Sequence, residues 1–162
     1  MIVKYYLCAD FFNDKSMNNK IIEAKDAIPV GESKEEKKQR KQFIKDLYRI
    51  WEAANPSKRA FNKSLNDFIY VKYISVDETA GQASHRYAST LAIMFLNEIL
   101  ENAVQKGAPK NSDHTKKNQK GFEKMITMEY RKEEFGTIKL TVGVKRGTKE
   151  KIQYCVTAIE NG

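Results

Sequence analysis

Residues 138–145 have the sequence IKLTVGVK, and this stretch decides the fold class. Its even positions, from Ile138 to Val144, are all apolar, whereas its odd positions are polar or glycine. Successive side chains of a strand point to opposite faces, so this spacing predicts a strand with one packed face and one open face.

The same period of two extends to both neighbouring segments, 122–130 and 152–159. Turn-forming residues at 133–136 and 146–149 separate the three segments, which predicts three consecutive antiparallel strands in sequence order. Their shared even register should place Leu140, Val142 and Val156 on one packed face. The other face should be polar and basic, lined by Thr127, Lys139, Thr141, Lys145, Gln153 and Thr157.

Helical spacing appears earlier in the chain. Ser33 and Glu36 form a capping box, which predicts a helix that begins there and ends near Asn55. Its apolar stripe consists of Phe43, Leu47, Ile50, Trp51 and Ala54. A second helix is predicted over 86–104, across the packed face of the sheet. Between the two helices we expect a strand at 68–74 and a polar connection at 77–84, and after them a basic loop at 110–119 with nothing to bury.

These elements predict an α+β fold with helices on one face of a C-terminal antiparallel sheet. One or two further strands are expected in the N-terminal segment, at 2–7 and 20–28. The length of 162 residues suits a single domain over 1–162. Residues 1–60 would form a strand-and-helix extension, and residues 61–162 the helix and meander.

Several classes of protein are excluded by the composition. No apolar run approaches the length of a membrane span, and the N-terminus lacks the features of a secretory signal, so we expect a cytoplasmic protein without membrane contact. There is no phosphate-binding glycine loop and no metal-ligand spacing, so no cofactor or metal is expected. Cys8 and Cys155 are interpreted as buried apolar residues rather than a disulfide.

Basic residues exceed acidic residues by eight, and the surplus is concentrated in residues 31–66 and 106–162. Such tracts suit an anionic partner such as RNA, DNA or an acidic protein surface, while the alternative is a surface of solubilising lysines. Aromatic residues beside basic ones at Tyr48-Arg49 and Tyr130-Arg131 suit stacking with nucleotides. The predicted nucleic-acid-binding residues are Lys37, Lys41, Lys45, Lys110, Lys116, Lys117, Lys145 and Arg146.

Three stretches carry a family resemblance: LNEILENA at 96–103, IKLTVGVK at 138–145 and YCVTAIE at 154–160. Over residues 61–160 the chain resembles domains associated with the large polyvalent proteins of phages and conjugative elements. Their helix followed by a short antiparallel sheet is similar to the barnase, EndoU, colicin and RelE group of metal-independent ribonucleases.

The ribonuclease resemblance implies a catalytic set. His85 would act as acid or base, Arg86 as a phosphate clamp, Lys139 as a cation beside the phosphate, and Thr157 as an orienting hydroxyl. The alternative for His85 is an ordinary residue at a helix N-terminus, bonded to a neighbour or to water. His114, in the basic loop, is expected to be exposed.

Three functions remain open from the sequence. The first is a phage or mobile-element accessory protein, such as a host-defence inhibitor, whose basic surface binds a host defence protein or a nucleic acid. The second is a metal-independent ribonuclease, and the third a simple RNA- or DNA-binding module. The shortness of the chain favours the binding role over the enzyme.

Overall fold

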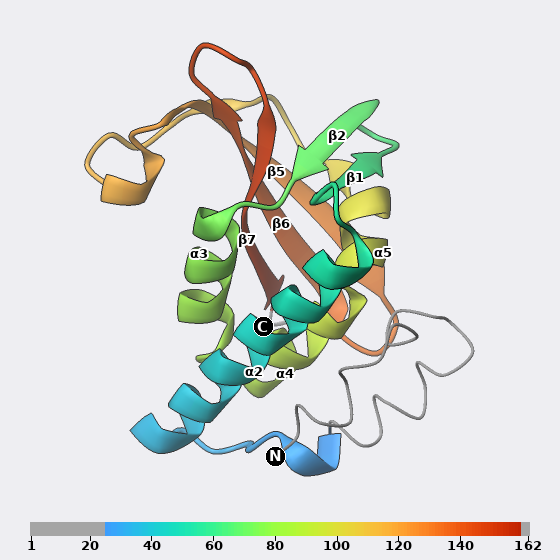
Figure 1. Ribbon diagram of the computed structural model, residues 1–162, viewed down its shortest axis with the longest axis vertical. Coiled ribbons are helices and arrows are strands. Elements are labelled where there is room, and N and C mark those ends of the chain that lie inside the picture. The colour runs from blue at the N-terminus through green and yellow to red at the C-terminus, as the bar shows by residue number, and fades with distance from the viewer. Residues whose placement is uncertain (1–24, 160–162) are drawn as a thin grey trace.

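The structure is a computed structural model that describes residues 25–159 (Figure 1). A curled seven-stranded sheet has the order β1-β2-β7-β6-β5-β3, with β4 pairing β5 off this path. All neighbours are antiparallel except β2 and β7, which are parallel. Helices α2, α4 and α5 pack on one face, and α3 runs beside β7. The α+β class is therefore confirmed, but the sheet is mixed and is not a simple C-terminal meander.

The three C-terminal strands form as predicted. They are β5 (Phe122–Lys132), β6 (Gly136–Lys145) and β7 (Lys151–Ile159), antiparallel and adjacent in sequence order. Leu140, Val142 and Val156 are fully buried in the core that the helices cover. The period of two in β6 thus identified the packed face correctly.

The predicted register is wrong at the start of β7. Val142 pairs with Gln153 and Thr141 with Cys155, so Tyr154 is an extra residue in a β-bulge. The bulge reverses the alternation: Gln153, expected on the open face, is fully buried beneath the helices. Ile152 and Tyr154, which the even register assigned to the packed face, therefore lie on the other face of the sheet. A second register shift, between Phe122 and Lys124, accompanies the same change for Phe122. These three residues form a second cluster there with Met125 and Cys155.

Helix α2 (Lys34–Ala54) begins where the capping box predicted. The Ser33 hydroxyl accepts from the amide of Glu36 at 3.1 Å, and the Glu36 carboxylate accepts from the amide of Gly31 at 2.8 Å. The Ser33 hydroxyl also donates to the Glu36 carboxylate at 2.7 Å, and this bond together with that from the Gly31 amide lowers the pKa of Glu36. The predicted stripe is buried except for Ala54, which is exposed at the last turn.

The segment between the predicted helices differs from expectation. Strand β1 (Arg59–Asn62) forms a hairpin with β2 (Asp67–Tyr70), and the strand predicted over 68–74 therefore stops at Tyr70. Helix α3 (Tyr73–Ala83) occupies the predicted polar connection. Its buried residues are Ser75, Thr79, Ala80 and Ala83, and such small or hydroxyl-bearing side chains give little hydrophobic periodicity.

The helix predicted over 86–104 is divided into three pieces. Helix α4 (Tyr87–Ala92), the 3-10 turn η3 (Ile93–Phe95) and helix α5 (Leu96–Asn102) follow one another, and a short strand β3 (Val104–Gln105) begins at the predicted end. The Thr90 hydroxyl donates to the carbonyls of Ala83 and Arg86 at the start of this region. Residues 91–96 are buried without exception, so the segment still lies at the centre of the core.

The N-terminal strand expected at 2–7 lies outside the described residues, as does most of 20–28. Residues 25–27, at the end of the second expected strand, are helical. That part of the prediction is wrong. No helix within residues 25–159 is both long enough and apolar enough to cross a membrane.

Three side-chain hydroxyl groups form hydrogen bonds with backbone groups at the edge of β7, beyond its short pairing with β2. Ser75 donates to the carbonyl of Gln153, Thr79 accepts from the amide of Val156 at 3.3 Å, and Ser89 accepts from the amide of Ala158 at 3.0 Å. An unpaired buried backbone group costs free energy, and an open strand edge invites aggregation. Helices α3 and α4 therefore complete the sheet through side chains rather than through another strand.

We expect Thr79→Val to lower the free energy of unfolding by about 1–3 kcal/mol. The substitution keeps the shape but removes the oxygen that also accepts from Gln153 Nε2 at 2.9 Å and lies 3.2 Å from the hydroxyl oxygen of Tyr48. Urea denaturation measures the change. Thr148→Val, in the exposed β6–β7 turn, is the control and should change stability by less than about 0.5 kcal/mol. Equal losses in both variants would contradict the edge-capping role.

Candidate functional site

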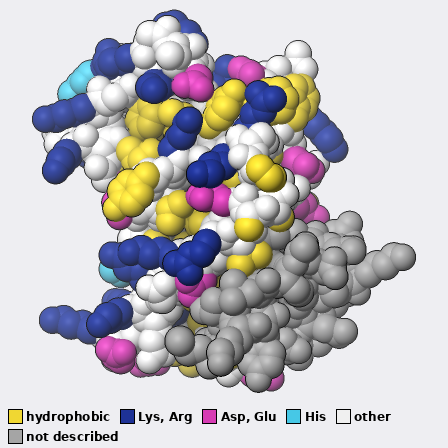
Figure 2. Space-filling model, in the orientation of Figure 1, with side chains coloured by type: hydrophobic (Ala, Val, Ile, Leu, Met, Phe, Trp, Pro, Cys, Tyr) yellow, Lys and Arg dark blue, Asp and Glu magenta, His cyan; other side chains and the backbone are white. Residues whose placement is uncertain are grey.

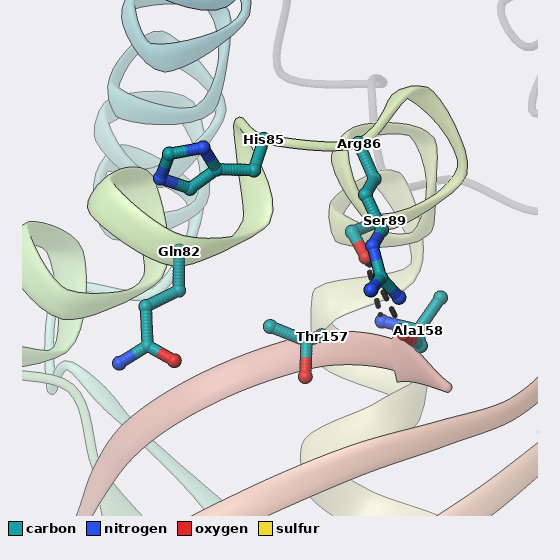
Figure 3. A pocket seen from close by; sticks show the side chains of 6 residues that line it. All are labelled: Gln82, His85, Arg86, Ser89, Thr157 and Ala158. Carbon is teal, nitrogen blue, oxygen red and sulfur yellow. Dashed lines mark hydrogen bonds between the residues drawn. The ribbon is translucent and has the colours of Figure 1, made fainter. Parts of the chain in front are cut away.

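A pocket of about 330 Å³ lies where the turn between α3 and α4 meets the end of β7 (Figure 3). Three of its six lining residues, His85, Arg86 and Thr157, are residues that the sequence analysis singled out. The other three, Gln82, Ser89 and Ala158, were not predicted. The fold thus brings together candidate residues that are more than 70 positions apart in the chain.

The turn between α3 and α4 presents His85 and Arg86 at the surface. The amide of His85 donates to the carbonyl of Gln82 at 3.3 Å, and the amide of Arg86 donates to that of Ala83 at 3.2 Å. Both side chains are exposed, and Figure 3 shows the guanidinium of Arg86 directed toward the end of β7. The backbone therefore fixes the turn while the two basic side chains face the pocket.

Buried Arg40 of α2 supports this turn from the other side. Its Nε donates to the carbonyl of Ser84 at 2.8 Å, and its Nη1 donates to the carbonyls of Pro29 and Gly31 at 2.8 and 2.7 Å. One guanidinium thus ties α2, the segment before α2 and the residue preceding His85 together.

Lys139, the fourth member of the predicted catalytic set, is adjacent to the pocket. It is the cross-strand neighbour of Thr157, and it is exposed on the face opposite Ile138 and Leu140. Glu129 of β5 is the next residue in the same row. The site therefore combines two cationic side chains, an imidazole, an amide and two hydroxyls, and none of the six pocket-lining residues is acidic.

This arrangement suits binding of an oxyanion better than proton transfer. Guanidinium and ammonium groups supply charge-assisted hydrogen bonds, and the hydroxyl and amide groups add neutral donors. General acid–base catalysis needs a second group to exchange a proton with the leaving atom. Among the residues lining the pocket, His85 is the one side chain of the type that most often serves as a general acid or base, so the pocket itself offers no second such group.

The predicted nucleic-acid-binding residues fall into two groups. Lys37, Lys41 and Lys45 lie along α2. The second group, Lys110, Lys116, Lys117, Lys145 and Arg146, lies on segment 106–121 and at the β6–β7 turn. Arg146 joins these two parts, because its Nε donates to the carbonyl of Lys120 at 3.2 Å. Figure 2 shows Lys and Arg side chains over both regions, at the left of the view.

Segment 106–121 is more ordered than the predicted loop with nothing to bury. It contains strand β4 (Lys110–Asn111) and the 3-10 turn η4 (Lys117–Gln119), and Ser112 and Gln119 are buried. Ser112 donates to the carbonyl of Phe122 at 2.6 Å, and Asn118 donates to Glu78 of α3. The segment is therefore fixed to the sheet and to α3, with its lysines outward. His114 is exposed, as predicted, and lies 3.1 Å from Arg146.

Two aromatic residues expected to stack with nucleotides do not fit that role. Tyr48 is fully buried, and its hydroxyl donates to Gln153 at 2.6 Å. Burial raises its pKa well above the ordinary value. Tyr130 packs partly against the core. The aromatic ring that precedes a basic residue in the sequence points inward in both places, so adjacency in the sequence did not imply a shared surface.

Cys155 is a buried free thiol, as predicted, and Cys8 lies outside the described residues. Burial raises the pKa of Cys155 to about 12, so the thiol stays protonated at neutral pH and is a poor nucleophile. Cys155 therefore has no place in the chemistry of the pocket.

Comparisons with known proteins found no match to this chain. No protein-family model matches the chain, and no curated protein or solved structure shows significant similarity to it.

Proposed function

We propose that the protein binds nucleic acid and that the pocket formed by His85, Arg86 and Thr157 holds a backbone phosphate. The observation that carries the proposal is the convergence of these residues in one hollow with Lys139 next to Thr157. A phosphate diester offers the negative oxygens that guanidinium, ammonium and hydroxyl groups recognise.

The two lysine-rich regions support the same proposal. Lysine is a flexible point charge, and such groups position a phosphate backbone rather than read a base sequence. Binding should therefore be salt-sensitive and weakly sequence-selective. The resemblance to domains of mobile elements suggests a biological role for this binding. In that role the protein is an accessory protein that competes with a host protein for nucleic acid.

Cleavage of RNA at this pocket is the second candidate function, and the exposed imidazole of His85 beside Arg86 favours it. In this candidate His85 takes the proton from a 2′-hydroxyl while the 2′-oxygen attacks the phosphorus. The bond from phosphorus to the 5′-oxygen breaks, and water protonates the leaving oxygen. Arg86 and Lys139 would stabilise the charge on the phosphate, and the Thr157 hydroxyl would orient it. No metal ion is required for these steps.

The pocket is tested by measuring RNA affinity with a fluorescently labelled oligonucleotide at low salt. We expect Arg86→Ala and Lys139→Ala each to weaken binding about tenfold, the loss of one charge-assisted contact. Lys63→Ala is the matched control, because this exposed lysine lies outside the pocket and donates to Asn102 at 3.1 Å. Equal affinities for all three variants would remove the pocket from the interface.

The same protein samples separate cleavage from binding. If the pocket is catalytic, labelled RNA is cut by the parent protein in the presence of a chelator. Cutting then stops when the 2′-hydroxyl is removed from the RNA or when His85 is replaced by alanine, while binding persists. Intact RNA after prolonged incubation with the parent protein would reject cleavage and leave the binding proposal in place.

A further inference from the structure

The outward face of the β1–β2 hairpin carries aromatic and basic side chains in register. Ala60 and Ile69 point inward and are buried. The side chains that alternate with them point outward, and the pairing sets Arg59 beside Tyr70 and Phe61 beside Phe68. Lys72 follows two residues after Tyr70, just before α3.

These five outward residues, Phe61, Phe68, Arg59, Tyr70 and Lys72, form an unbroken series of contacts that we call the hairpin ladder. The rings of Phe61 and Phe68 meet edge to face at 5.4 Å. The guanidinium of Arg59 lies 3.9 Å from the centre of the Phe68 ring, and its Nη1 donates to the Tyr70 hydroxyl at 3.3 Å. The ammonium of Lys72 lies 5.3 Å from the centre of the Tyr70 ring.

The ladder is partly open to solvent: Arg59, Phe61 and Lys72 are exposed, whereas Phe68 and Tyr70 are half-buried. Phe61 is 44% exposed, and it is among the few large apolar side chains that the described part of the chain leaves in water. Figure 2 shows hydrophobic and basic side chains interleaved over the hairpin, at the top right of the view. The neighbouring carboxylate, Asp67, is occupied by an ion pair with Lys151 at 2.7 Å. The surface therefore presents aromatic rings and positive charge, and the carboxylate that adjoins Phe68 in the sequence is already paired.

This combination suits one class of partner. Aromatic faces stack on nucleobases, and interleaved cations attract the phosphates between them. A duplex hides the faces of its bases, whereas a single strand exposes them. We propose that the hairpin ladder stacks the bases of a single-stranded segment of nucleic acid. The inference rests on the proposed function, and it adds that the protein binds single-stranded nucleic acid in preference to a duplex.

The topology relates the ladder to the pocket. Strand β2 pairs with β7 at Lys151 and Ile152, whereas the pocket contains Thr157 and Ala158 at the other end of β7. Five to six residues of strand separate the two sites by about 17–20 Å. An oligonucleotide that reaches both sites must therefore be several nucleotides long.

The test compares one labelled sequence as a single strand and as a duplex. We expect Phe61→Ala and Phe61→Leu to weaken single-strand binding about tenfold, because either change removes a stacking ring, and to change duplex binding less than about twofold. Phe61→Leu keeps an apolar side chain, so it separates stacking from folding. Lys63→Ala, on the same hairpin connection, is the matched control. A 2-aminopurine base in the single strand should lose fluorescence on binding to the parent protein and keep it with Phe61→Leu.

Each outcome has a definite meaning. Unchanged single-strand affinity and unchanged 2-aminopurine quenching in both Phe61 variants, with a parent protein that binds, would reject the ladder and leave the proposed function standing. Loss of affinity for single strand and duplex alike would also reject it. A parent protein that is a dimer in light scattering and becomes a monomer on Phe61→Leu would show that this face joins two copies instead. Absence of any nucleic-acid binding by the parent would overturn the proposed function itself.

Discussion

Leu140→Ala is expected to lower the free energy of unfolding by about 2–5 kcal/mol. Leu140 is fully buried between the sheet and the core helices, so its truncation removes apolar contacts and leaves a cavity that close-packed neighbours cannot fill completely. Phe95→Ala should have an effect of similar size, because Phe95 packs against Phe135 with ring centres 5.5 Å apart.

Thermal denaturation of Leu140→Ala, Phe95→Ala and Lys116→Ala checks this expectation. Lys116 is exposed in segment 106–121, and its truncation should change stability by less than about 0.5 kcal/mol. Equal melting temperatures for the three variants would mean that the helices do not pack on this face of the sheet.

Arg40→Met is expected to cost about 2–4 kcal/mol, although methionine removes a buried charge. Replacing a whole buried ionic network by apolar groups can be neutral, but here the partners remain. The carbonyls of Pro29, Gly31 and Ser84 each lose a charge-assisted hydrogen bond, and that of Ser84 is held in a buried contact. The cost of leaving these carbonyls without a donor therefore exceeds the free energy gained by no longer burying the guanidinium.

Arg49→Met is the matched control on the same helix. The side chain of Arg49 is 68% exposed but pairs at 3.3 Å with Asp46, whose side chain is only 8% exposed, so its loss should change stability by about 1 kcal/mol at most. Urea denaturation compares the two variants. The Arg40 variant should also bind RNA more weakly when folded, because Ser84 precedes His85 in the turn. Coincident denaturation midpoints would contradict the structural role of Arg40.

The parts of the fold that follow simple periodicity were predictable. Strand β6 alternates strictly, and α2 has both a cap and an apolar stripe. The bulge at Tyr154 was not predictable, since the even positions of residues 152–159 are apolar throughout and give no sign of a break in the strand. The observed register depends on the hydrogen bonds that Gln153 makes with Tyr48 and Thr79. Helix α3 was missed for a related reason: its buried face binds the edge of β7 through hydroxyls rather than through apolar side chains.

The candidate site, too, was predictable only where its residues follow the periodicity of a strand. The alternation of apolar and polar residues predicted that Lys139 and Thr157 lie on the open face of the sheet, and both lie there. Gln82 and Ser89 were missed because their proximity to Thr157 depends on how α3 and α4 dock on β7. The hairpin ladder was missed because strand β1 was not among the predicted elements. The alternation of Arg59, Ala60, Phe61 and Asn62 is a strand signal of only four residues, and that is too short to identify without the partner strand.

The central claim, that the protein binds nucleic acid through its basic groups, is tested most directly by a salt titration. The measurement is the fluorescence anisotropy of a labelled single-stranded RNA of about 12 nucleotides, with the unaltered protein added at each salt concentration. We predict binding at about 50 mM salt and a loss of affinity of at least about tenfold at about 200 mM, because bound cations release counterions from the phosphates. Unchanged anisotropy at about 50 mM salt, for RNA and for DNA of the same sequence, would contradict the account.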